Sequence, residues 1–354
     1  MYDAIVIGAG QGGLAAGYYL KRNKLDYLIL EASDQTAGSW PKYYDSLTLF
    51  SPIRYSSLPG LAIPGHPDSY PLKEEVIRYL NKYRTHFNLH VKTNKKVIGV
   101  SKNSRSFTVT IQDGTTYQAK AIINATGAFN HPYIPHIEGE EFFEGRVLHT
   151  YQYKRPESFE GERVLVVGGR NSAVQVAVEL ARVAEVSLAT RTPIKYLPQK
   201  FLGKDGHFWG RVIGVDTFPI GLWKTVRDKE PVIDLGGFKQ SIEVDRNPDQ
   251  RTMFKKFTKN GVEWTDGNIE RIDSVIFATG FKPTFPYLES LPEAVGEDGF
   301  ALQRGGISTT IEGLYYVGLH WQRNHASATL RGVGPDAKFI LKRLKKYLRS
   351  IQNN

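Results

Sequence analysis

The sequence predicts an α/β fold that contains two similar strand–turn–helix–strand units, the second inserted within the first. The first observation is a short apolar run at 4–10 that ends in glycines, continues into a helical pattern and reaches a further strand at 26–31. The second observation is a copy of this pattern at 163–169, where Gly168 follows Gly8 by 160 residues. A repeat of this length indicates two related domains, because the period of a solenoid is only about 20–50 residues.

The tripeptide Ala-Thr-Gly marks the same two units again. It follows a strand-like run and precedes an aromatic residue at both 125–127 and 278–280. Stretches rich in proline and glycine come after each copy, at 131–145 and 282–299. The predicted domain boundaries are residues 1–155 and 270–354 for a discontinuous first domain, and residues 156–269 for the second.

Composition excludes several classes of protein. The chain has 354 residues, and 41% of them are hydrophobic, which is enough for ordinary packed cores. It has no cysteine, which rules out a disulfide framework, a thiolate zinc site, an iron–sulfur cluster and a C-x-x-C redox pair. Only His86 and His90 have the spacing of a metal-binding helix face, and no further ligand accompanies them, so we predict no metal site. Without a secretory signal or a long apolar stretch, we expect a cytoplasmic protein with no integral membrane segment.

The charge of the chain is concentrated at its C-terminal end. The net charge is +10, and six of the basic residues lie between Lys338 and Arg349 with no acid among them. We expect this segment to be a helix packed on the first domain, with a weak peripheral contact to a membrane surface or an acidic partner as the alternative. No zinc finger, RNP motif or helix-turn-helix pattern indicates nucleic-acid binding, and a homodimer is left open.

The first glycine-rich turn has the pattern of a dinucleotide-binding site. Its glycines, Gly8, Gly10, Gly12 and Gly13, allow a tight turn, close approach of a pyrophosphate and packing of the helix on the strand. The helix N-terminus offers free N–H groups to the phosphates. Glu31 lies 23 residues beyond Gly8, where a carboxylate accepts hydrogen bonds from ribose hydroxyls and repels a 2′-phosphate. This turn therefore predicts a site for FAD or NAD that excludes NADP.

The second turn, residues 168–173, differs from the first at one place. Arg170 stands where the second glycine is expected, and its Cβ would crowd a pyrophosphate. Either the turn opens and the guanidinium pairs with phosphate oxygens, or nucleotide binding is weakened; we favour the first because the rest of the pattern is kept. Arg191, at the position equivalent to Glu31, carries the opposite charge and has Thr190 and Thr192 beside it, which suits a 2′-phosphate. We therefore predict two Rossmann-like dinucleotide-binding domains, one for FAD and one for NADPH, with NADH as the alternative.

Two dinucleotide sites in one chain imply that electrons pass from a nicotinamide to a flavin. Disulfide reductases share this plan, but they need a cysteine pair that this chain lacks. Oxygen, a quinone or another external acceptor remains.

A further motif resembles the flavin-containing monooxygenases. The residues Phe143, Gly145, His149 and Tyr153 match the fingerprint F-x-G-x-x-x-H-x-x-x-(W/Y/F), which precedes a second glycine turn in that family. The resemblance to bacterial members spans nearly the whole chain and includes four other motifs: the first glycine turn, Gly38-Ser39-Trp40, the two Ala-Thr-Gly sequences and residues 318–334.

The resemblance implies an FAD-dependent monooxygenase that uses NADPH and O2. In that family a C4a-hydroperoxyflavin oxygenates sulfides, amines or ketones, and the protein keeps the cavity dry. The implied FAD contacts are Gly8, Gly10, Gly12, Gly13, Glu31, Gly38, Ser39, Trp40, Val97, Ala125, Thr126, Gly127, Gly318 and Gln322. The implied NADP contacts are Gly168, Gly169, Arg170, Asn171, Ser172, Thr190, Arg191, Thr279 and Gly280.

Two residues of the resemblance have open roles. Several members of the family place an asparagine near the flavin, but the matching stretch, residues 46–60, has none and carries Ser51 instead. Ser51 is our candidate catalytic residue, with a turn hydroxyl beside Pro52 as the alternative. For His149 we expect a neutral side chain packed at the domain junction rather than a direct part in catalysis.

Two other classes of function remain open. Arg170 and the missing asparagine favour an NAD(P)H:flavin oxidoreductase or oxidase that passes electrons to a quinone or O2 without oxygenating a substrate. The basic tail favours a nucleotide-responsive regulatory or membrane-associated protein. The sequence does not specify the substrate. We expect loops such as 46–60 and 201–240 to form the cavity, and the sequence does not give the geometry of these loops.

Overall fold

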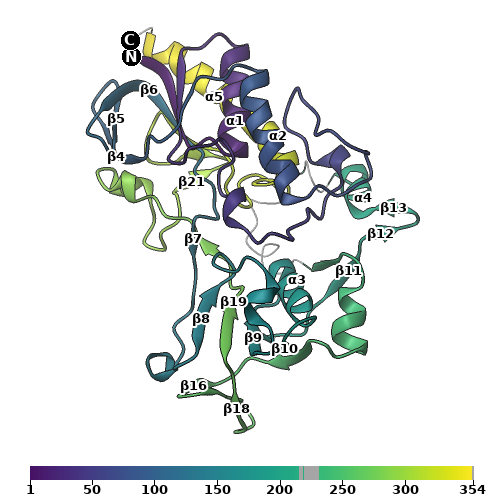
Figure 1. Ribbon diagram of the computed structural model, residues 1–354. Coiled ribbons are helices and arrows are strands. Elements are labelled where there is room, and N and C mark those ends of the chain that lie inside the picture. Colours follow the sequence, from purple (N-terminus) through teal and green to yellow (C-terminus); the bar gives the residue numbers. More distant parts are fainter. Residues whose placement is uncertain (215–217, 219–230, 353–354) are drawn as a thin grey trace.

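The chain forms two lobes, each built around its own β-sheet (Figure 1). The computed structural model describes residues 1–214, 218 and 231–352. The predicted α/β fold with two dinucleotide-binding domains is confirmed, since parallel strands followed by helices occur in both lobes.

The first sheet has nine strands, and its parallel part has the order β23–β6–β1–β2–β3. The apolar run Ala4–Ile7 is buried along its length, as expected for a strand covered on both faces. Its strands are β1 (Tyr2–Ile7), β2 (Tyr27–Leu30), β3 (Val91–Lys92), β4 (Val97–Lys102), β5 (Phe107–Ile111), β6 (Thr116–Asn124), β21 (Gln303–Arg304), β22 (Ile307–Ser308) and β23 (Leu314–Tyr316).

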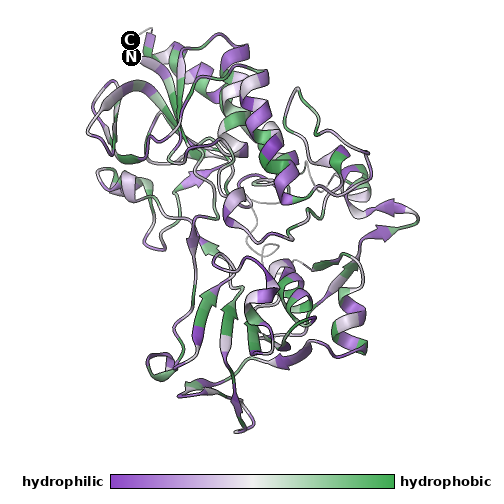
Figure 2. Ribbon diagram, in the orientation of Figure 1, coloured by the Kyte–Doolittle hydropathy of each residue, from purple (hydrophilic) through white to green (hydrophobic). Residues whose placement is uncertain are grey.

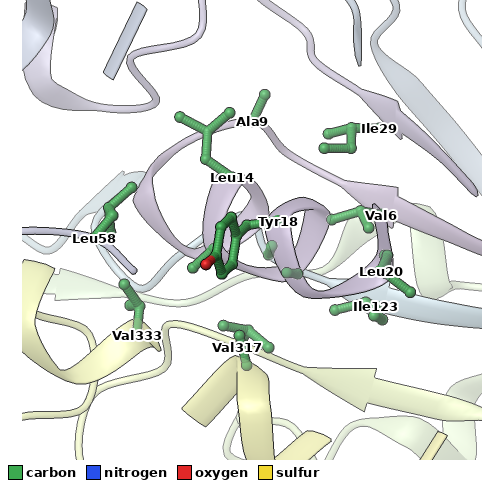
Figure 3. Packing of buried hydrophobic residues seen from close by; sticks show 14 of the residues in the cluster. Val6, Ala9, Leu14, Tyr18, Leu20, Ile29, Leu58, Ile123, Val317 and Val333 are labelled. Atoms are coloured by element: carbon green, nitrogen blue, oxygen red, sulfur yellow. The ribbon is translucent and has the colours of Figure 1, made fainter. Parts of the chain in front are cut away.

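Three helices complete the first lobe: α1 (Gln11–Arg22), α2 (Lys73–His86) and α5 (Leu330–Gln352). Figure 3 shows Leu14 and Tyr18 of α1 among the buried side chains that also include Val317 and Val333. The C-terminal segment is a helix packed on this lobe, as predicted, because its apolar stripe of Ile340, Leu341, Leu344 and Leu348 is buried. None of the helices within residues 1–214 and 231–352 is long and apolar enough to cross a bilayer.

The second sheet is entirely parallel and has the order β15–β10–β9–β19–β8. Its strands are β8 (Arg146–His149), β9 (Arg163–Val167), β10 (Glu185–Thr190), β15 (Asp249–Thr252) and β19 (Ser274–Phe277). The helix α3 (Asn171–Leu180) packs on this sheet through Val174 and Ala177. In Figure 2 most of β8 and β19 is green, so these strands are apolar. Smaller elements are β11 (Tyr196–Pro198), β12 (Lys200–Phe201), β13 (Lys204–Asp205), α4 (Gly206–Val212), β14 (Val232–Asp234), β16 (Lys256–Thr258), β17 (Gly261–Glu263) and β18 (Ile269–Arg271).

The strand pairing places β8 and β19 beyond the predicted limits of the second domain, 156–269. Both strands pair within the second sheet, although the predicted boundaries assign them to the first domain. The predicted boundary at 155–156 falls too late, because the proline- and glycine-rich linker ends at residue 145 and the fingerprint that follows it contains the paired strand β8. The chain passes between the lobes at β7 (His131–Pro132) and β20 (Phe281–Lys282), which pair with each other. We propose β7 and β20 as the domain boundaries.

Candidate functional site

A large cavity lies between the two lobes and is lined by both glycine-rich turns. Its volume is about 2340 Å³. This exceeds the about 300–1,000 Å³ that is usual for a single small-molecule site. The turns that follow β1 and β9 lie at the carboxyl ends of parallel strands, which is where open α/β sheets bind ligands.

The cavity collects almost all of the residues predicted from the sequence. Every residue predicted to contact NADP lines it, and so does every predicted FAD contact except Gly13 and Gln322. A Cβ on Gly13 would lie 1.9 Å from the Gly8 carbonyl oxygen, so the missing side chain serves the turn itself. Gln322 is buried outside the cavity lining, and its side-chain oxygen accepts a hydrogen bond from the Leu319 N–H at 3.3 Å. Neither residue lines the cavity, and their contact with FAD stays a prediction.

Two glycines from separate motifs meet at the first turn. A Cβ on Gly10 would lie 3.2 Å from the Cα of Gly38, and a Cβ on Gly38 would lie 2.9 Å from the Cα of Gly10. Gly38 also has φ +57°, a left-handed conformation that favours glycine. The sequence identified both glycines, but only the fold brings them together. Their contact leaves backbone rather than side chains facing the cavity.

The Glu31 carboxylate connects the end of β2 to the first turn. Its Oε2 accepts a hydrogen bond from the Ala9 N–H at 2.6 Å, and its Oε1 accepts bonds from the Ser33 N–H and hydroxyl at 2.9 and 2.8 Å. A carboxylate has about four lone-pair sites, so at least one remains for a ribose hydroxyl. Helix α1 begins with neither a side-chain cap nor an acid in its first turn, which leaves its N–H groups available to phosphates. The first turn therefore fits FAD.

The second turn accommodates Arg170 without distortion. Gly168 has a φ of +147°, which favours glycine, and a Cβ there would lie 2.6 Å from the Ala278 carbonyl oxygen. Arg170 is exposed, and its φ of −118° is extended, so its backbone requires no glycine. The next residue, Asn171, accepts a hydrogen bond from the Ile233 N–H at 3.0 Å and so connects the turn to β14. Helix α3 also begins without a side-chain cap or an acid in its first turn, which suits a phosphate.

The end of β10 carries the groups that suit a 2′-phosphate. Thr190 is buried, and its hydroxyl accepts a hydrogen bond from the side chain of Gln250 at 2.8 Å. Arg191 is exposed on the cavity wall beside Thr192. Among the described residues, the acids that line the cavity are Glu31 and Asp298, and neither belongs to the second lobe. Gln250 was not found from the sequence, because nothing in the local pattern connects it to Thr190.

Ser51 lies on the cavity wall, but its hydroxyl is already engaged. Its Oγ is 2.8 Å from the Oγ of Ser56, which itself donates to the backbone carbonyls of Ser51 and Pro52, both at 2.9 Å. Either hydroxyl can be the donor in the contact between the two Oγ atoms. With either direction the Ser51 Oγ keeps a lone pair that can accept a hydrogen bond from a bound molecule.

His149 is a neutral, packed side chain, as predicted. Its Nε2 donates to the Gly280 carbonyl oxygen at 2.9 Å, and its Nδ1 accepts from the Tyr151 N–H at 3.1 Å. Burial lowers the pKa of His149 below its usual value of 6.5. The imidazole therefore joins the end of β8 to the second Ala-Thr-Gly sequence.

A cluster of aromatic rings surrounds Phe281 where the lobes meet. Its ring centroid lies 4.9 Å from that of His149, 5.8 Å from Phe129 and 6.4 Å from Tyr43. Burial raises the pKa of Tyr43 to about 12, so its hydroxyl stays protonated. Tyr43 was missed in the sequence, whereas the two phenylalanines had a signal because each follows an Ala-Thr-Gly sequence.

Comparison with known proteins defines the class of this protein. The chain belongs to the pyridine nucleotide-disulphide oxidoreductase family, whose sequence profile matches residues 5–200. It is 34% identical to an uncharacterized oxidoreductase named CzcO from Bacillus subtilis, over 97% of this chain and 99% of that protein. It is 33% identical to a probable indole-3-pyruvate monooxygenase, YUCCA1 of Arabidopsis thaliana, over 90% of this chain and 85% of that protein.

A solved structure extends the similarity to the whole fold. The flavin-containing monooxygenase from Stenotrophomonas maltophilia has a TM-score of 0.86 and 31% identity, over 98% of this chain and 99% of that chain. The predicted resemblance to flavin-containing monooxygenases is thereby confirmed. The protein is an FAD-dependent oxidoreductase of the flavin monooxygenase type that uses NADPH. With no cysteine in the chain, it cannot use the thiol pair that a disulfide reductase needs.

The contact between Gly10 and Gly38 predicts the effect of Gly10→Ala. The added Cβ would separate the two segments where we expect the pyrophosphate, and overpacking of this kind costs about 1–3 kcal/mol, or about 5- to 150-fold in affinity. We expect a corresponding loss of FAD affinity, measured by flavin titration of the apoprotein. The matched control is Gly210→Ala on α4, because no atom lies within 4 Å of that added Cβ. Equal affinities for FAD in the two variants would contradict the role of this contact.

The burial of His149 predicts a pH-dependent stability. As pH falls below about 6.5, the unfolded chain takes up a proton that native His149 resists, so the free energy of unfolding decreases. His149→Gln keeps a side-chain N–H donor but does not titrate, and we expect a smaller decrease between about pH 6.5 and pH 5. Urea unfolding at a series of pH values measures this. The control is His136→Gln, whose side chain is 85% exposed; a His149→Gln profile parallel to wild type would refute the assignment.

Proposed function

We propose that this protein oxygenates small soft nucleophiles, such as sulfides and amines, or ketones, at the expense of NADPH and O2. One observation carries the proposal: two dinucleotide-type turns from separate lobes open into the same cavity, while the chain has no cysteine to receive electrons. The two turns allow a nicotinamide and a flavin to meet. When bound, FAD supplies hydride acceptance and the activation of O2 that protein side chains cannot.

The two ends of the cavity support different nucleotides. At the first lobe, Glu31 offers an acceptor to ribose and repels a 2′-phosphate. At the second lobe, Arg191 offers a cation with hydroxyl groups beside it. We assign FAD to the first lobe and NADPH to the second on this difference of charge.

The residues at the junction between the lobes are mainly aromatic and carry no charge. The Phe281 cluster and the neutral His149 present no ionised group where the lobes meet, and Phe129 and Phe281 give the cavity wall an apolar surface there. Ser51 adds an acceptor on the wall that fits an N–H group of a bound flavin or nicotinamide. These features support oxygen transfer to a substrate over the release of reduced oxygen into water.

The stoichiometry of the reaction tests this function. We expect NADPH consumption to rise when a thioether, a tertiary amine or a cyclic ketone is added, with oxygenated product formed in proportion to the NADPH used. Product is measured by chromatography and H2O2 by a peroxidase assay in the same samples. Stoichiometric H2O2 with every substrate would favour the oxidase instead, and rapid reduction of a quinone without O2 consumption would favour the reductase.

The charge of Arg191 predicts the nucleotide preference. Hydrogen bonds to charged groups contribute about 1.5–3 kcal/mol, so Arg191→Ala should lower kcat/KM for NADPH by about 10- to 150-fold. The value for NADH should change little, because NADH has no 2′-phosphate. The control is Arg182→Ala, an exposed arginine of the same lobe that does not line the cavity. A preference for NADH that Arg191→Ala leaves unchanged would remove the assignment of NADPH to this lobe.

A further inference from the structure

A short hairpin and the helix after it project from the edge of the molecule. β12 and β13 pair through a two-residue loop, Leu202-Gly203, and lead directly into α4 (Figure 1). Leu202 is 74% exposed and Phe201 is 60% exposed at the tip, while Val212 and Ile213 are exposed at the end of α4. We call Phe201, Leu202, Val212 and Ile213 the hairpin surface.

The backbone at the tip makes its apolar character unusual. Leu202 has φ +49°, and Gly203 has φ +71°. Two-residue hairpin loops with both residues at positive φ prefer Asn-Gly or Asp-Gly, because other side chains are strained there. An exposed leucine in this conformation neither packs in the core nor suits the turn. The fold itself therefore does not explain a leucine at this position, whereas contact of its side chain with another molecule would explain it.

Hydrogen bonds connect the hairpin to α4 and to the first lobe. The Trp209 indole N–H on α4 donates to the Phe201 carbonyl oxygen at 2.9 Å. Asp205 caps α4 by accepting from the His207 N–H at 2.8 Å, and the Tyr70 hydroxyl from the first lobe donates to the same carboxylate. The exposed side chains thus lie on a hairpin and a helix that hydrogen bonds attach to each other and to the first lobe.

The same element reaches the wall of the cofactor cavity. The His207 ring stacks on Phe50, with centroids 6.1 Å apart and an angle of 18°. Phe50 in turn lines the cavity. A molecule held at the hairpin surface would therefore lie next to an element that packs against the wall of this cavity.

Basic side chains surround the hairpin surface. Lys195, Lys200, Lys204 and Arg211 are exposed, whereas the one acid in residues 195–214 is Asp205. That carboxylate is directed at His207 and Tyr70, and its side chain is only 10% exposed. The surface thus combines an apolar tip with exposed basic side chains.

We propose that the hairpin surface docks this protein on an anionic lipid membrane. Apolar side chains that enter the headgroup region together with nearby lysines are the combination that holds proteins on anionic bilayers. A stable protein interface buries about 800 Å² per partner, which suits a broad face rather than a projecting tip. Helix α5 is also basic, but its apolar stripe is buried, and it exposes no large apolar side chain within its described residues.

Flotation of the FAD-loaded full chain with vesicles tests the proposal. We expect binding to phosphatidylcholine vesicles that contain phosphatidylserine, weak binding to phosphatidylcholine alone, and release at high salt. Leu202→Asn should lower binding by about tenfold, because it removes the apolar tip. Asparagine suits the backbone conformation of this position better than leucine, so unfolding would not explain the loss. Replacing Lys200 and Lys204 by Gln should also weaken binding and reduce its salt dependence.

Two control variants distinguish binding through the hairpin surface from non-specific binding to vesicles. Ile269→Ser removes an apolar side chain that is 70% exposed elsewhere on the second lobe, and it should leave vesicle binding unchanged. Replacing Lys342 and Lys346 on α5 by Gln should also have no effect. No binding to anionic vesicles, binding unaffected by Leu202→Asn, or binding lost only in the α5 variant would each overturn the proposal. A concentration-dependent dimer that Leu202→Asn dissociates, without a change in vesicle binding, would identify a second copy of the chain as the occupant instead.

Discussion

The structure depends on one backbone contact that occurs twice. A Cβ on Gly8 would lie 2.7 Å from the carbonyl oxygen of Ala125, and a Cβ on Gly168 would lie 2.6 Å from that of Ala278. In each lobe the glycine ends a central strand, and the alanine follows the neighbouring parallel strand, β6 or β19. Only glycine allows the two segments to approach so closely, and this approach opens each turn toward the cavity. The repeated Ala-Thr-Gly sequence therefore marks the partner of each glycine turn.

The segments that follow this repeated contact also join the two lobes at the site. The aromatic residues after each Ala-Thr-Gly sequence, Phe129 and Phe281, meet with their ring centroids 5.8 Å apart. His149 donates to Gly280, and the linkers that contain β7 and β20 pair with each other. The junction between the lobes is thus made largely of the segments that directly follow the two Ala-Thr-Gly sequences. Through Phe129 and Phe281 this junction also lines part of the cavity.

The two halves of the site differ in the charge and in the backbone that they present to a bound nucleotide. Glu31 and Arg191 hold equivalent positions, yet the first is buried and bonded to its own turn, whereas the second is exposed on the cavity wall. Gly10 is required because Gly38 lies against it, while Arg170 occupies the equivalent place in an extended, exposed conformation. The departure of the second turn from the glycine pattern is therefore explained by the motif Gly38-Ser39-Trp40, which crosses only the first turn. The fold therefore has room for Arg170 at the place where the sequence pattern expects glycine.

The sequence by itself determined the features that depend on local backbone requirements. Both glycine turns, the charges of Glu31 and Arg191 and the strand before each Ala-Thr-Gly were predictable, because a tight turn or a buried strand restricts the residue types at successive positions. Only the tertiary structure decided the pairing of β8 and β19, the hydrogen bond between Ser51 and Ser56, and the bond between Gln250 and Thr190. It also decided that Leu202 is exposed at a strained turn. Most of these features join segments that are distant in the chain, and all depend on which surfaces the folded chain leaves open, which no local pattern specifies.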